Sequence, residues 1–569
     1  MTVEKLITDH IDIWSSALQT RSTAGRGSNG KIDLYGIKKL RELILELAVR
    51  GKLVPQDPND EPASELLKRI AAEKAELVKQ GKIKKQKSLT EISEDEKPFE
   101  LPARWEWVRF GNIYEMEYGD NLPQEKRTNT GEYNVYGSNG VVGTHKVACV
   151  NSPCIVIGRK GSAGALNLSL NAGCWVTDVA YSTIPPIAMN IDFVYLQFHT
   201  LGLDSLGKGI KPGLNRNDAY GLAIAIPPQN EQENIVIKVK ELMSLCDQLE
   251  QQSLTSLDAH QQLVETLLAT LTDSQNAEEL AENWARISQH FDTLFTTGSS
   301  IDALKQTILQ LAVMGKLVPQ DPNDEPASEL LKRIEQEKAQ LVKEGKIKKQ
   351  KPLPPVSDEE KPFVLPKGWE WCRLGEIGDP IDSAIVDGPF GSSINTKIDY
   401  KENGQHPVTR MGNIRPFLYL KSDLKYVSEE KLNSLKRHNI IAGDVLMGKV
   451  GSIGNATIYP NDMPEGLIAT TGVARFRVGR SILNSLLCYE LNALAPKLNE
   501  IASEAVQPFL NMKTINNCII GLPPLREQKK IVDKTNAIFL ACDTLKSRLQ
   551  SAQQTQLHLA DALTDAALS

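Results

Sequence analysis

The amino-acid sequence contains a long internal repeat, and this repeat restricts the possible folds more than any other feature. Residues 48–87 and 312–351 are identical at thirty-five of forty positions, at an offset of 264. The similarity extends upstream, where IKKLRELILELAVRGKL (37–53) aligns with IDALKQTILQLAVMGKL (301–317). Because segments this similar adopt the same local structure, the repeat predicts two copies of one structural frame.

Further similarity lies downstream, on either side of a dissimilar stretch. KPFELPARWEWVRFGNI (97–113) aligns with KPFVLPKGWEWCRLGEI (361–377), again at offset 264. After the dissimilar stretch, IPPQNEQENIV (226–236) aligns with LPPLREQKKIV (522–532) at a new offset of 296. The order similar, different, similar thus occurs twice. It indicates a constant frame that presents two different modules.

The repeat also gives the expected domain boundaries. A chain of 569 residues is too long for one ordinary core, so several domains are expected. We expect an N-terminal helical region with a linker, a first module, a central helical spacer, a second module and a C-terminal helix. These segments span residues 1–98, 99–233, 234–362, 363–529 and 530–569.

The two modules have the sequence texture of strand-rich domains. Short apolar runs such as CIVIG (154–158) and DVLMG (444–448) alternate with Gly, Asn, Ser and Asp, which is typical of strands joined by turns. Residues 192–206 and 481–504 look helical. Each module is therefore expected to be a mixed α/β domain.

The segments after the Pro-Pro motifs have the periodicity of long helices. Apolar residues at 235, 239, 242, 246 and 249 alternate steps of four and three, as in a coiled-coil seam. We favour an antiparallel coiled coil of 235–271 with 531–567, about 55 Å long at 1.5 Å per residue. Two amphipathic helices docked on separate cores are the alternative. The expected fold is α+β with a pseudo-two-fold internal repeat, in which long helices separate the two modules.

The overall charge does not exclude nucleic acid as a partner of the modules. The net charge is −6, yet residues 99–228 and 363–524 together hold 27 basic and 27 acidic residues. The whole excess of acidic residues therefore lies outside these two segments.

Cysteine, histidine and hydropathy patterns argue against metals and membranes. The eight Cys and eight His contain no C-x-x-C or H-E-x-x-H motif, so we expect buried thiols and no metal site. No apolar run approaches the roughly eighteen residues of a membrane helix, and the start lacks a signal pattern. We expect a cytoplasmic protein.

Motifs for catalysis are also missing from the sequence. There is no G-x-x-x-x-G-K-[ST] phosphate loop, and IPPQ and LPPL lack the Asn and the aromatic residue of an adenine methyltransferase N-P-P-[YF] motif. We expect the isolated chain to be catalytically inert.

Two L-P-x-x-W-E-W motifs, two dissimilar modules and two P-P-x-x-E-Q motifs together resemble the specificity subunit of type I restriction–modification systems over nearly the whole chain. The resemblance implies that the modules are target recognition domains, each reading half of a split double-stranded DNA sequence. It further implies that the helices set the half-site spacing and dock two modification (adenine methyltransferase) subunits, which restriction (translocase and nuclease) subunits join.

The same resemblance assigns the cofactors to the partners. S-adenosylmethionine belongs to the methyltransferase, and ATP and Mg belong to the restriction subunit, so we expect none bound by this chain. Two other classes stay open at this point: a coiled-coil adapter presenting two protein-binding modules, and a self-contained DNA-modifying enzyme.

Polar loops in the first module supply the first set of candidate DNA contacts. They lie in YGSNGVVG (136–143), GRKGSAG (158–164) and GKGIKPGLNRND (207–218), where glycine permits close approach to phosphate and polar side chains supply donors. Hairpin turns and solvated loops are the alternatives. The candidate residues are Tyr136, Ser138, Asn139, Arg159, Lys160, Ser162, Lys208, Lys211, Asn215 and Arg216.

The second module has corresponding loops in DGPFGSS (387–393), RMGNIR (410–415) and GKVGSIG (448–454). The candidate residues there are Ser392, Ser393, Arg410, Asn413, Arg415, Lys449 and Ser452. GRKGSAG and GKVGSIG share the form G-[RK]-x-G-S-x-G after a short apolar run, which predicts one strand–loop structure that grips DNA in both modules. We expect Arg159 to read a base and Lys449 to hold phosphate, because only the guanidinium has the planar fork for guanine.

Two further basic features are interpreted as structural. Arg475 and Arg477 alternate along ARFRV (474–478), which favours a charge pair on an edge strand over a DNA contact. The lysine tracts at 81–87 and 345–351 are interpreted as solvated linkers, with contact to the partner or to flanking DNA as the alternative.

Overall fold

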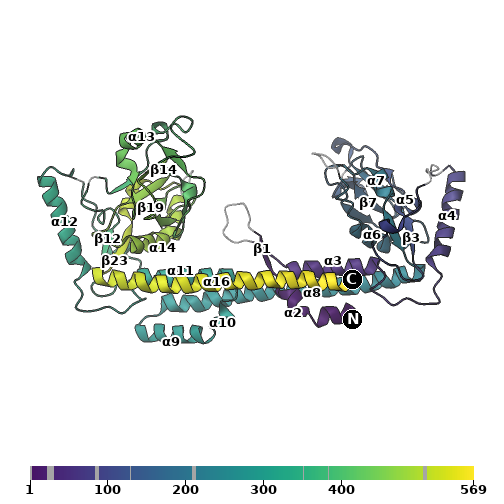
Figure 1. The fold of residues 1–569 in the computed structure, drawn as a ribbon, viewed down its shortest axis with the longest axis horizontal. Helices are drawn as coiled ribbons and strands as arrows, with labels where there is room; N and C mark the ends of the chain where they lie inside the picture. The colour runs from purple at the N-terminus through teal and green to yellow at the C-terminus, as the bar shows by residue number, and fades with distance from the viewer. Residues whose placement is uncertain are drawn as a thin grey trace. The chain divides into compact units, whose positions relative to one another are not determined.

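The computed structural model of the chain describes residues 3–21, 31–81, 83, 89–128, 130–207, 213–349, 351–381, 383–503 and 509–569. The chain forms two compact units, one made of Met1–Leu257 with Ser551–Ser569 and the other of Asp258–Gln550 (Figure 1). Two long helices, α8 (Gln229–Asp273) and α16 (Leu525–Leu568), contribute residues to both units.

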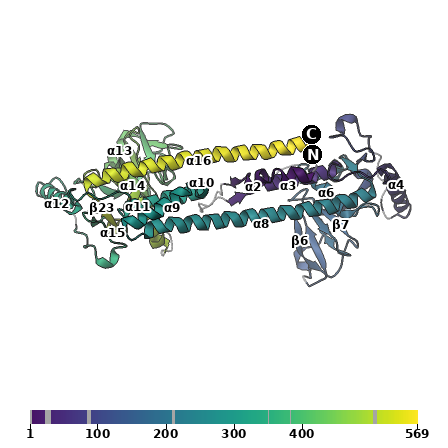
Figure 2. The ribbon, with the colours of Figure 1, turned by 90° about the horizontal axis from the view of Figure 1, so that it is seen from below.

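In the first unit, α3 (Tyr35–Val49) packs antiparallel to the first part of α8 (Figure 2). In the middle of α3, Arg41 donates to Asp247 Oδ1 at 2.7 Å and to Glu250 Oε2 at 2.8 Å. Just beyond the end of α3, Gln56 donates to Glu231 Oε1 at 3.1 Å. The order of these contacts fixes the opposite directions of the two helices.

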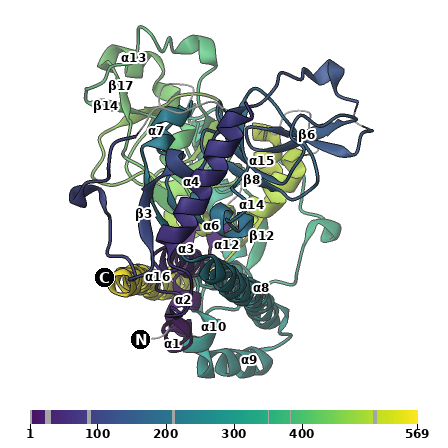
Figure 3. The same ribbon diagram turned by 90° about the vertical axis from the view of Figure 1, so that its right-hand side faces the viewer.

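The end of α16 packs parallel to α3 within the same unit. The Tyr35 hydroxyl donates to Asp561 Oδ1 at 2.7 Å, and Lys52 Nζ donates to the carbonyl of Leu568 at 2.8 Å. The first part of α8 and the end of α16 therefore run in opposite directions, and α3 contacts both of them. Figure 3 shows these three helices grouped below the first module.

The second unit repeats this arrangement with α11 (Gly298–Val313) in the place of α3. Lys305 donates to Asp543 Oδ1 at 2.5 Å, in the first part of α16. Lys316 donates to the carbonyl of Thr272 at 2.7 Å, at the end of α8. Thr272 and Leu568 are equivalent at the 296-residue offset, so one lysine caps the last turn of each long helix.

The long helices predicted at 235–271 and 531–567 are confirmed, and each begins six residues earlier than expected. The earlier starts follow the Pro-Pro pairs 227–228 and 523–524 directly, where a fixed φ suits the entrance to a first turn. The apolar periodicity of the long helices gave only one contact face. It did not predict that α3 and α11 would also contact α8 and α16.

The remaining frame helices are short except for one pair. The first unit contains α1 (Val3–Thr8), α2 (Ile11–Ser16), the strand pair β1 (Gln19–Arg21) and β2 (Lys31–Asp33), and α4 (Ala63–Lys79). The second unit contains α9 (Ala277–Gln289), α10 (Phe291–Leu294) and α12 (Ala327–Lys343). In the repeated helices α4 and α12, equivalent residues are buried: Ala63, Leu66 and Ile70, and Ala327, Leu330 and Ile334.

The first module contains two sheets and a separate strand pair. A four-stranded antiparallel sheet has the order β4-β10-β7-β8, a three-stranded sheet has the order β6-β5-β9, and β11 pairs with β3. The strands are β3 (Glu106–Arg109), β4 (Glu117–Tyr118), β5 (Tyr133–Gly137), β6 (Gly140–His145), β7 (Cys154–Gly158), β8 (Leu166–Ser169), β9 (Trp175–Val176), β10 (Ala180–Thr183) and β11 (Ala223–Ile226). The helices are α5 (Phe110–Ile113), α6 (Ile191–Thr200) and α7 (Arg216–Tyr220).

The second module has an equivalent sheet in the order β13-β22-β19-β20, a second sheet β17-β14-β21-β18, and the pairs β12-β23 and β15-β16. The strands are β12 (Glu370–Arg373), β13 (Ile385–Asp387), β14 (His406–Thr409), β15 (Ile414–Arg415), β16 (Leu418–Tyr419), β17 (Lys425–Val427), β18 (Asn439–Ile440), β19 (Val445–Gly448), β20 (Ala456–Ile458), β21 (Gly466–Ile468), β22 (Val473–Phe476) and β23 (Ile519–Leu522). The helices are α13 (Glu429–Ser434), α14 (Asn484–Ser503) and α15 (Met512–Asn517).

The expected α+β class with an internal repeat is confirmed, and the predicted module strands and helices are present. CIVIG forms β7, all five of whose residues are buried, and the DVLMG run forms β19. The helix expected at 192–206 ends at Thr200, because Gly202 takes φ +60° just beyond it. In the part of the chain that the structure describes, no helix has the length and apolar character needed to cross a membrane.

Candidate nucleic-acid interface

Both modules carry the same glycine loop after a central strand. The first glycine loop (158–164) begins at the end of β7, and the second glycine loop (448–454) begins at the end of β19. In each loop the amide of the seventh residue donates to the carbonyl of the first. Gly164 donates to Gly158 at 2.8 Å, and Gly454 donates to Gly448 at 3.0 Å. The fourth and seventh residues are glycines with φ between +72° and +82°, a region that side chains disfavour. The predicted shared strand–loop structure is confirmed, and its contact with DNA stays a prediction.

A second segment is bonded to the glycine loop in each module. The amide of Leu214 donates to the carbonyl of Arg159 at 2.9 Å, and the amide of Leu510 donates to the carbonyl of Lys449 at 3.1 Å. One antiparallel bridge, Lys160 with Gly213 and Val450 with Phe509, extends each pairing by one residue pair. The loops around 158–164 and 213–216, predicted separately, are therefore neighbours.

An asparagine in this second segment caps the helix that follows. Asn215 Oδ1 accepts the amide of Asn217 in α7 at 3.0 Å, and Asn511 Oδ1 accepts the amide of Thr514 in α15 at 2.8 Å. Sequence analysis did not single out Asn511. The 296-residue offset of the Pro-Pro motifs would have found it, because the same offset aligns the Leu-Asn pairs before α7 and α15.

The turn between β5 and β6 lies against the first glycine loop. A β-carbon on Gly158 would collide with the carbonyl oxygens of Ser138 and Ser162, so glycine is required for this close approach. Asn139 in the turn is exposed, whereas Tyr136 before it is buried. The buried Tyr136 side chain belongs to the module core and is held away from the surface.

Three predicted polar segments of the first module therefore meet at one end of its sheets. Lys160 and Asn215 are exposed there, and Ser138 and Ser162 are half-buried. The other two candidates of this module, Lys208 and Lys211, lie outside the described residues.

Two arginines of the first module lie over one exposed tyrosine. The guanidinium carbons of Arg159 and Arg216 are 4.8 Å and 4.7 Å from the ring centroid of Tyr118, which is 52% exposed. Each guanidinium also donates to a backbone carbonyl, Arg159 to Asp178 at 2.8 Å and Arg216 to Met116 at 3.0 Å. Among the described residues, no carboxylate forms an ion pair with either arginine. Both cations are thus oriented by the protein, and no carboxylate among the described residues compensates their charge.

Lys449 occupies the loop position of Arg159, but it is buried. Its side chain is 0% exposed, its Nζ donates to Asp387 Oδ2 at 2.7 Å, and Nζ lies 4.9 Å from the ring centroid of Phe509. The charge is already compensated and shielded from solvent. The phosphate contact predicted for Lys449 therefore has no support in this conformation, and the side chain joins β13 to the second glycine loop instead.

Arg410 and Asn413 mainly hold their own loop together. Arg410 forms an ion pair with Asp423 Oδ2 at 2.8 Å. The buried Asn413 donates to the carbonyls of Leu420 and Ser422 at 3.0 Å and 3.2 Å, and accepts the amide of Arg410 at 2.9 Å. The side-chain amide of Asn413 is therefore already hydrogen-bonded to backbone groups, so its role is structural. The exposed candidates of the second module are Ser392, Arg415 and Ser452, and Ser393 is half-buried.

The loop containing Arg410 touches the second glycine loop. It follows β14, which pairs in parallel with β21 just as β5 pairs with β9 in the first module. A β-carbon on Gly448 would lie 3.1 Å from Met411 Cε. The loop thus takes the place that the β5–β6 turn has beside the first glycine loop.

The prediction of an edge-strand charge pair for Arg475 and Arg477 is wrong. Arg475 lies in β22, which pairs with both β13 and β19 and is therefore internal, and Arg477 directly follows the end of this strand. Arg475 is 1% exposed and donates to the carbonyl of Asn439, and burial lowers its pKa to about 10. Arg477 forms an ion pair with Asp444 at 2.7 Å. Arg475 is thus inside the module, whereas Arg477 is half-buried and paired with a carboxylate.

The two repeated motifs meet where each long helix begins. Trp105 of the first L-P-x-x-W-E-W motif donates its Nε1–H to Glu231 at 3.0 Å, and Trp369 donates to Glu527 at 3.0 Å. Burial raises the pKa of both carboxyls, while the hydrogen bonds oppose this effect. The motifs therefore fasten the frame to the start of α8 and of α16.

The glutamine beside each of these carboxylates fastens the module to the same helix. Gln232 accepts the amide of Asn190 at 2.9 Å, and Gln528 accepts the amide of Leu483 at 2.8 Å. Both glutamines are fully buried and donate back to the carbonyl of a proline in the Pro-Pro pair. The E-Q pair is thus a joint between frame, helix and module.

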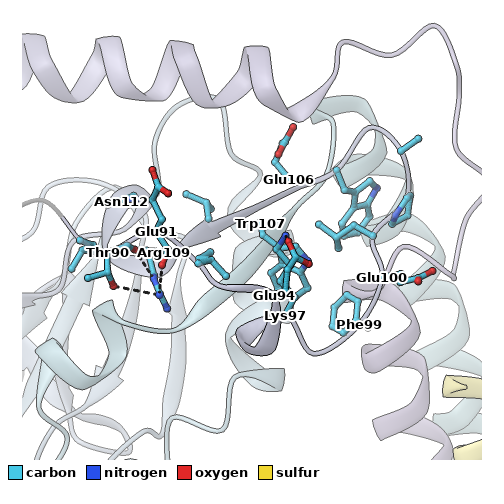
Figure 4. Close-up of a pocket in the computed structure, with 17 residues that line it drawn as sticks. Thr90, Glu91, Glu94, Lys97, Phe99, Glu100, Glu106, Trp107, Arg109 and Asn112 are labelled. Carbon is cyan, nitrogen blue, oxygen red and sulfur yellow. Dashed lines mark hydrogen bonds and ion pairs between the residues drawn. The ribbon is translucent and has the colours of Figure 1, made fainter.

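The end of the linker and the first residues of the first module together line a groove of about 930 Å³ (Figure 4). At one end, Arg109 donates to the carbonyls of Thr90 and Glu91, both at 3.0 Å, and the hydrogen bonds from Arg109 lower the pKa of Glu96 to about 2. The groove is lined by Leu89, Thr90, Glu91, Ile92, Glu94, Lys97, Phe99, Glu100, Leu101, Pro102, Ala103, Trp105, Glu106, Trp107, Val108, Arg109 and Asn112. Because it lies in the repeated frame, it is a candidate surface for a protein partner.

The cysteines and histidines show no arrangement for a metal. All eight cysteines are free, six of them buried, and Cys154 and Cys174 have their sulfurs 3.6 Å apart. No group of three His, Cys, Asp or Glu side chains in the described residues is placed to hold a metal ion.

Comparison with known proteins gives the class of this architecture. The family described as "Type I restriction modification DNA specificity domain" matches residues 102–259 and 366–553. The chain is 50% identical to the type I restriction enzyme EcoEI specificity subunit and 49% identical to the EcoAI specificity subunit, both from Escherichia coli, over the full length of all three. Among solved structures, a chain from "Structural basis underlying complex assembly and conformational transition of the type I R-M system" is 19% identical, with a TM-score of 0.44 over 83% of this chain and 99% of that chain.

The two matched domains, each carrying a glycine loop on a shared frame, define a two-module DNA-recognition protein. The chain belongs to the family of type I restriction–modification specificity subunits. Its role in such a system is DNA recognition, in a complex with the other subunits, and it is not catalytic on its own. The adapter without a DNA role is not supported.

Proposed function

We propose that each module reads one half of a split DNA target, from the end of its sheets where the glycine loop lies. The observation that carries this proposal is the equivalence of the two loops in backbone structure together with the difference in their side chains. A common backbone suits a common docking mode on the duplex, and different side chains suit different bases. Exposed Lys160, and Arg159 and Arg216 over the Tyr118 ring, supply positive charge for phosphates and base edges.

The repeated frame is proposed to dock two copies of one partner, the modification subunit. Helices α4 and α12 repeat their surface ion pairs, with Lys68–Glu65 and Lys332–Glu329 both at 2.7 Å. Equal surfaces of this kind suit two copies of the same protein. The modification subunits would bring S-adenosylmethionine, and restriction subunits that join them would bring ATP and Mg.

A module exchange tests the reading of half-sites. We expect that replacing 99–233 with the corresponding module of a relative changes one half of the methylated sequence and leaves the other half intact. The readout is methylome sequencing of cells that express the complete complex, with the wild-type chain as the reference. A change in both halves, or in neither, would contradict independent reading.

Binding to DNA is tested separately by its salt dependence. We expect the complex with modification subunits to bind a duplex with both half-sites, with an affinity that falls steeply as salt rises, because phosphate contacts release counterions. An affinity that depends on neither the salt concentration nor the half-site sequence would contradict the proposal. Methyl transfer by the chain alone would instead indicate an enzyme.

A further inference from the structure

Tyr118 and Asp387 occupy the same position in the equivalent sheets of the two modules. Tyr118 pairs with Tyr181 on β10, and Asp387 pairs with Ala474 on β22. Tyr181 in turn pairs with Ile157, and Ala474 pairs with Met447. Ile157 and Met447 are the residues directly before the two glycine loops. The position therefore lies beside the second residue of the loop, which is Arg159 in one module and Lys449 in the other.

The chemistry at this position differs between the modules. Tyr118 contacts Arg159 through its ring, 4.8 Å from the guanidinium carbon, which leaves the positive charge available to a ligand. Asp387 instead forms an ion pair with Lys449 at 2.7 Å, which compensates the charge. The residue paired with the loop cation thus decides whether that cation is presented.

We propose that Tyr118 and Asp387 are specificity-determining residues that set how each module uses its loop cation, an inference that rests on the DNA-reading function proposed above. In the first module, Tyr118 orients Arg159 and Arg216 as a paired guanidinium site for a guanine, whose N7 and O6 both accept hydrogen bonds in the major groove. In the second module, Asp387 holds Lys449 away from the surface. The loop then presents backbone groups beside the 42% exposed Phe509 of the neighbouring segment.

The geometry of the arginines favours base reading over loose phosphate contact. One nitrogen of each guanidinium donates to a backbone carbonyl, that of Asp178 for Arg159 and that of Met116 for Arg216. The other N–H groups of the rigid guanidinium can then donate to a ligand. Stacking on one ring restricts the rotamers of both side chains before DNA arrives, which lowers the ordering cost of binding. A lysine in either place would offer neither property.

The test uses the complete chain in complex with modification subunits, and single-mismatch duplexes in each half-site. We expect Tyr118→Ala to reduce discrimination at one base pair of the first half-site by about 5- to 150-fold, with discrimination in the second half-site retained. Tyr118→Phe, which keeps the ring, should retain most of the discrimination. Ile187→Ala, at a 91% exposed position of the same module, is the matched control and should bind as wild type.

The second module provides an effect of the opposite sign. Asp387→Asn removes the charge compensation of Lys449 with almost no change in shape. We expect tighter binding at low salt for all duplexes, and a salt slope steeper by about 0.9, the value for one added phosphate contact. Thermal unfolding of each variant shows whether it is folded.

The outcomes separate this inference from the function on which it rests. Wild-type complex that fails to bind the split duplex would overturn the proposed function itself. Wild-type binding with unchanged discrimination in folded Tyr118→Ala, or an unchanged salt slope in folded Asp387→Asn, would overturn the inference and leave the function standing. Uniform weakening by Tyr118→Ala on all duplexes would show a phosphate contact and would equally overturn base reading.

Discussion

Arg159 and Lys449 show how one loop position acquires two roles through its neighbours. Both residues follow the first glycine of the same loop structure, and each backbone is bonded to the equivalent second segment of its own module. The side chains nevertheless end in different surroundings, beside an exposed Tyr118 or a carboxylate. The exposure of the loop side chain is therefore set by its partner on the neighbouring strand as much as by its own type.

A buried carboxyl in the second module is expected to lower the stability of the chain. Glu490 in α14 is buried, its Oε1 has no hydrogen-bond partner, and burial raises its pKa well above the usual range. The equivalent residue of α6 is Gln197, whose amide donates to the carbonyl of Ala225 at 2.6 Å. We expect Glu490→Gln to stabilise the chain at neutral pH by on the order of 1 kcal/mol.

The pH dependence of this effect has a definite sign. Because the folded pKa of Glu490 is raised, burial of this carboxyl destabilises the chain above the ordinary pKa near 4.5. The gain from Glu490→Gln should therefore shrink as the pH falls from 7.5 towards 4.5. Thermal unfolding at several pH values measures it. Gln197→Glu is the matched variant and should destabilise at neutral pH, and a pH-independent gain would contradict the explanation.

Residue-scale contacts were the least predictable part of the site. The sequence motif G-[RK]-x-G-S-x-G predicted the shared loop, because its glycines serve local backbone conformations. It did not predict that Lys449 would be buried, because the compensating Asp387 is 62 residues away along the chain. The prediction of an edge-strand position for Arg475 was wrong for the same reason, because the strands on both sides of β22 come from distant segments.

At the scale of elements, the joint at the start of each long helix is the central feature. One carboxylate in the first turn accepts hydrogen bonds from a tryptophan and a glutamine of the frame, and the next residue binds the module helix. The P-P-x-x-E-Q motif is therefore repeated for structural reasons. The Pro-Pro pair predicted that a helix follows, although the apolar periodicity placed each start six residues too late. The hydrogen-bond partners of the motif were not predictable, because they lie 42 to 175 residues away along the chain.

The element-scale prediction concerns this joint. We expect Trp105→Phe to destabilise the first unit by about 1–3 kcal/mol, because the buried Glu231 loses a donor that offsets its desolvation. Native-state hydrogen exchange of the full chain is the measurement, since it resolves units separately. Trp369→Phe is the matched variant and should affect the second unit. Equal effects of either variant on both units would show that the joint is not local.

At the scale of the whole molecule, the duplication explains why two modules can diverge while their attachment does not. The α3 and α11 contacts, the lysine caps on Thr272 and Leu568, and the E-Q joints recur on both sides. Changes inside a module therefore leave the frame intact. The repeat predicted this organisation from the sequence, because 35 of 40 identical positions leave little freedom for different structures.

The last prediction treats α8 and α16 as the elements that set the gap between half-sites. Deleting one heptad from 235–271 and the matching heptad from 531–567 removes about 10 Å of helix, which corresponds to roughly three base pairs. We expect the methylated target to keep both half-sites and to lose about three base pairs of gap, as read by methylome sequencing. Replacing the exposed residues of the same heptads without deletion is the control and should leave the gap unchanged. Because the deletion preserves the heptad register of the apolar seam, an active complex with an unaltered gap would mean that other parts of the assembly hold the modules apart.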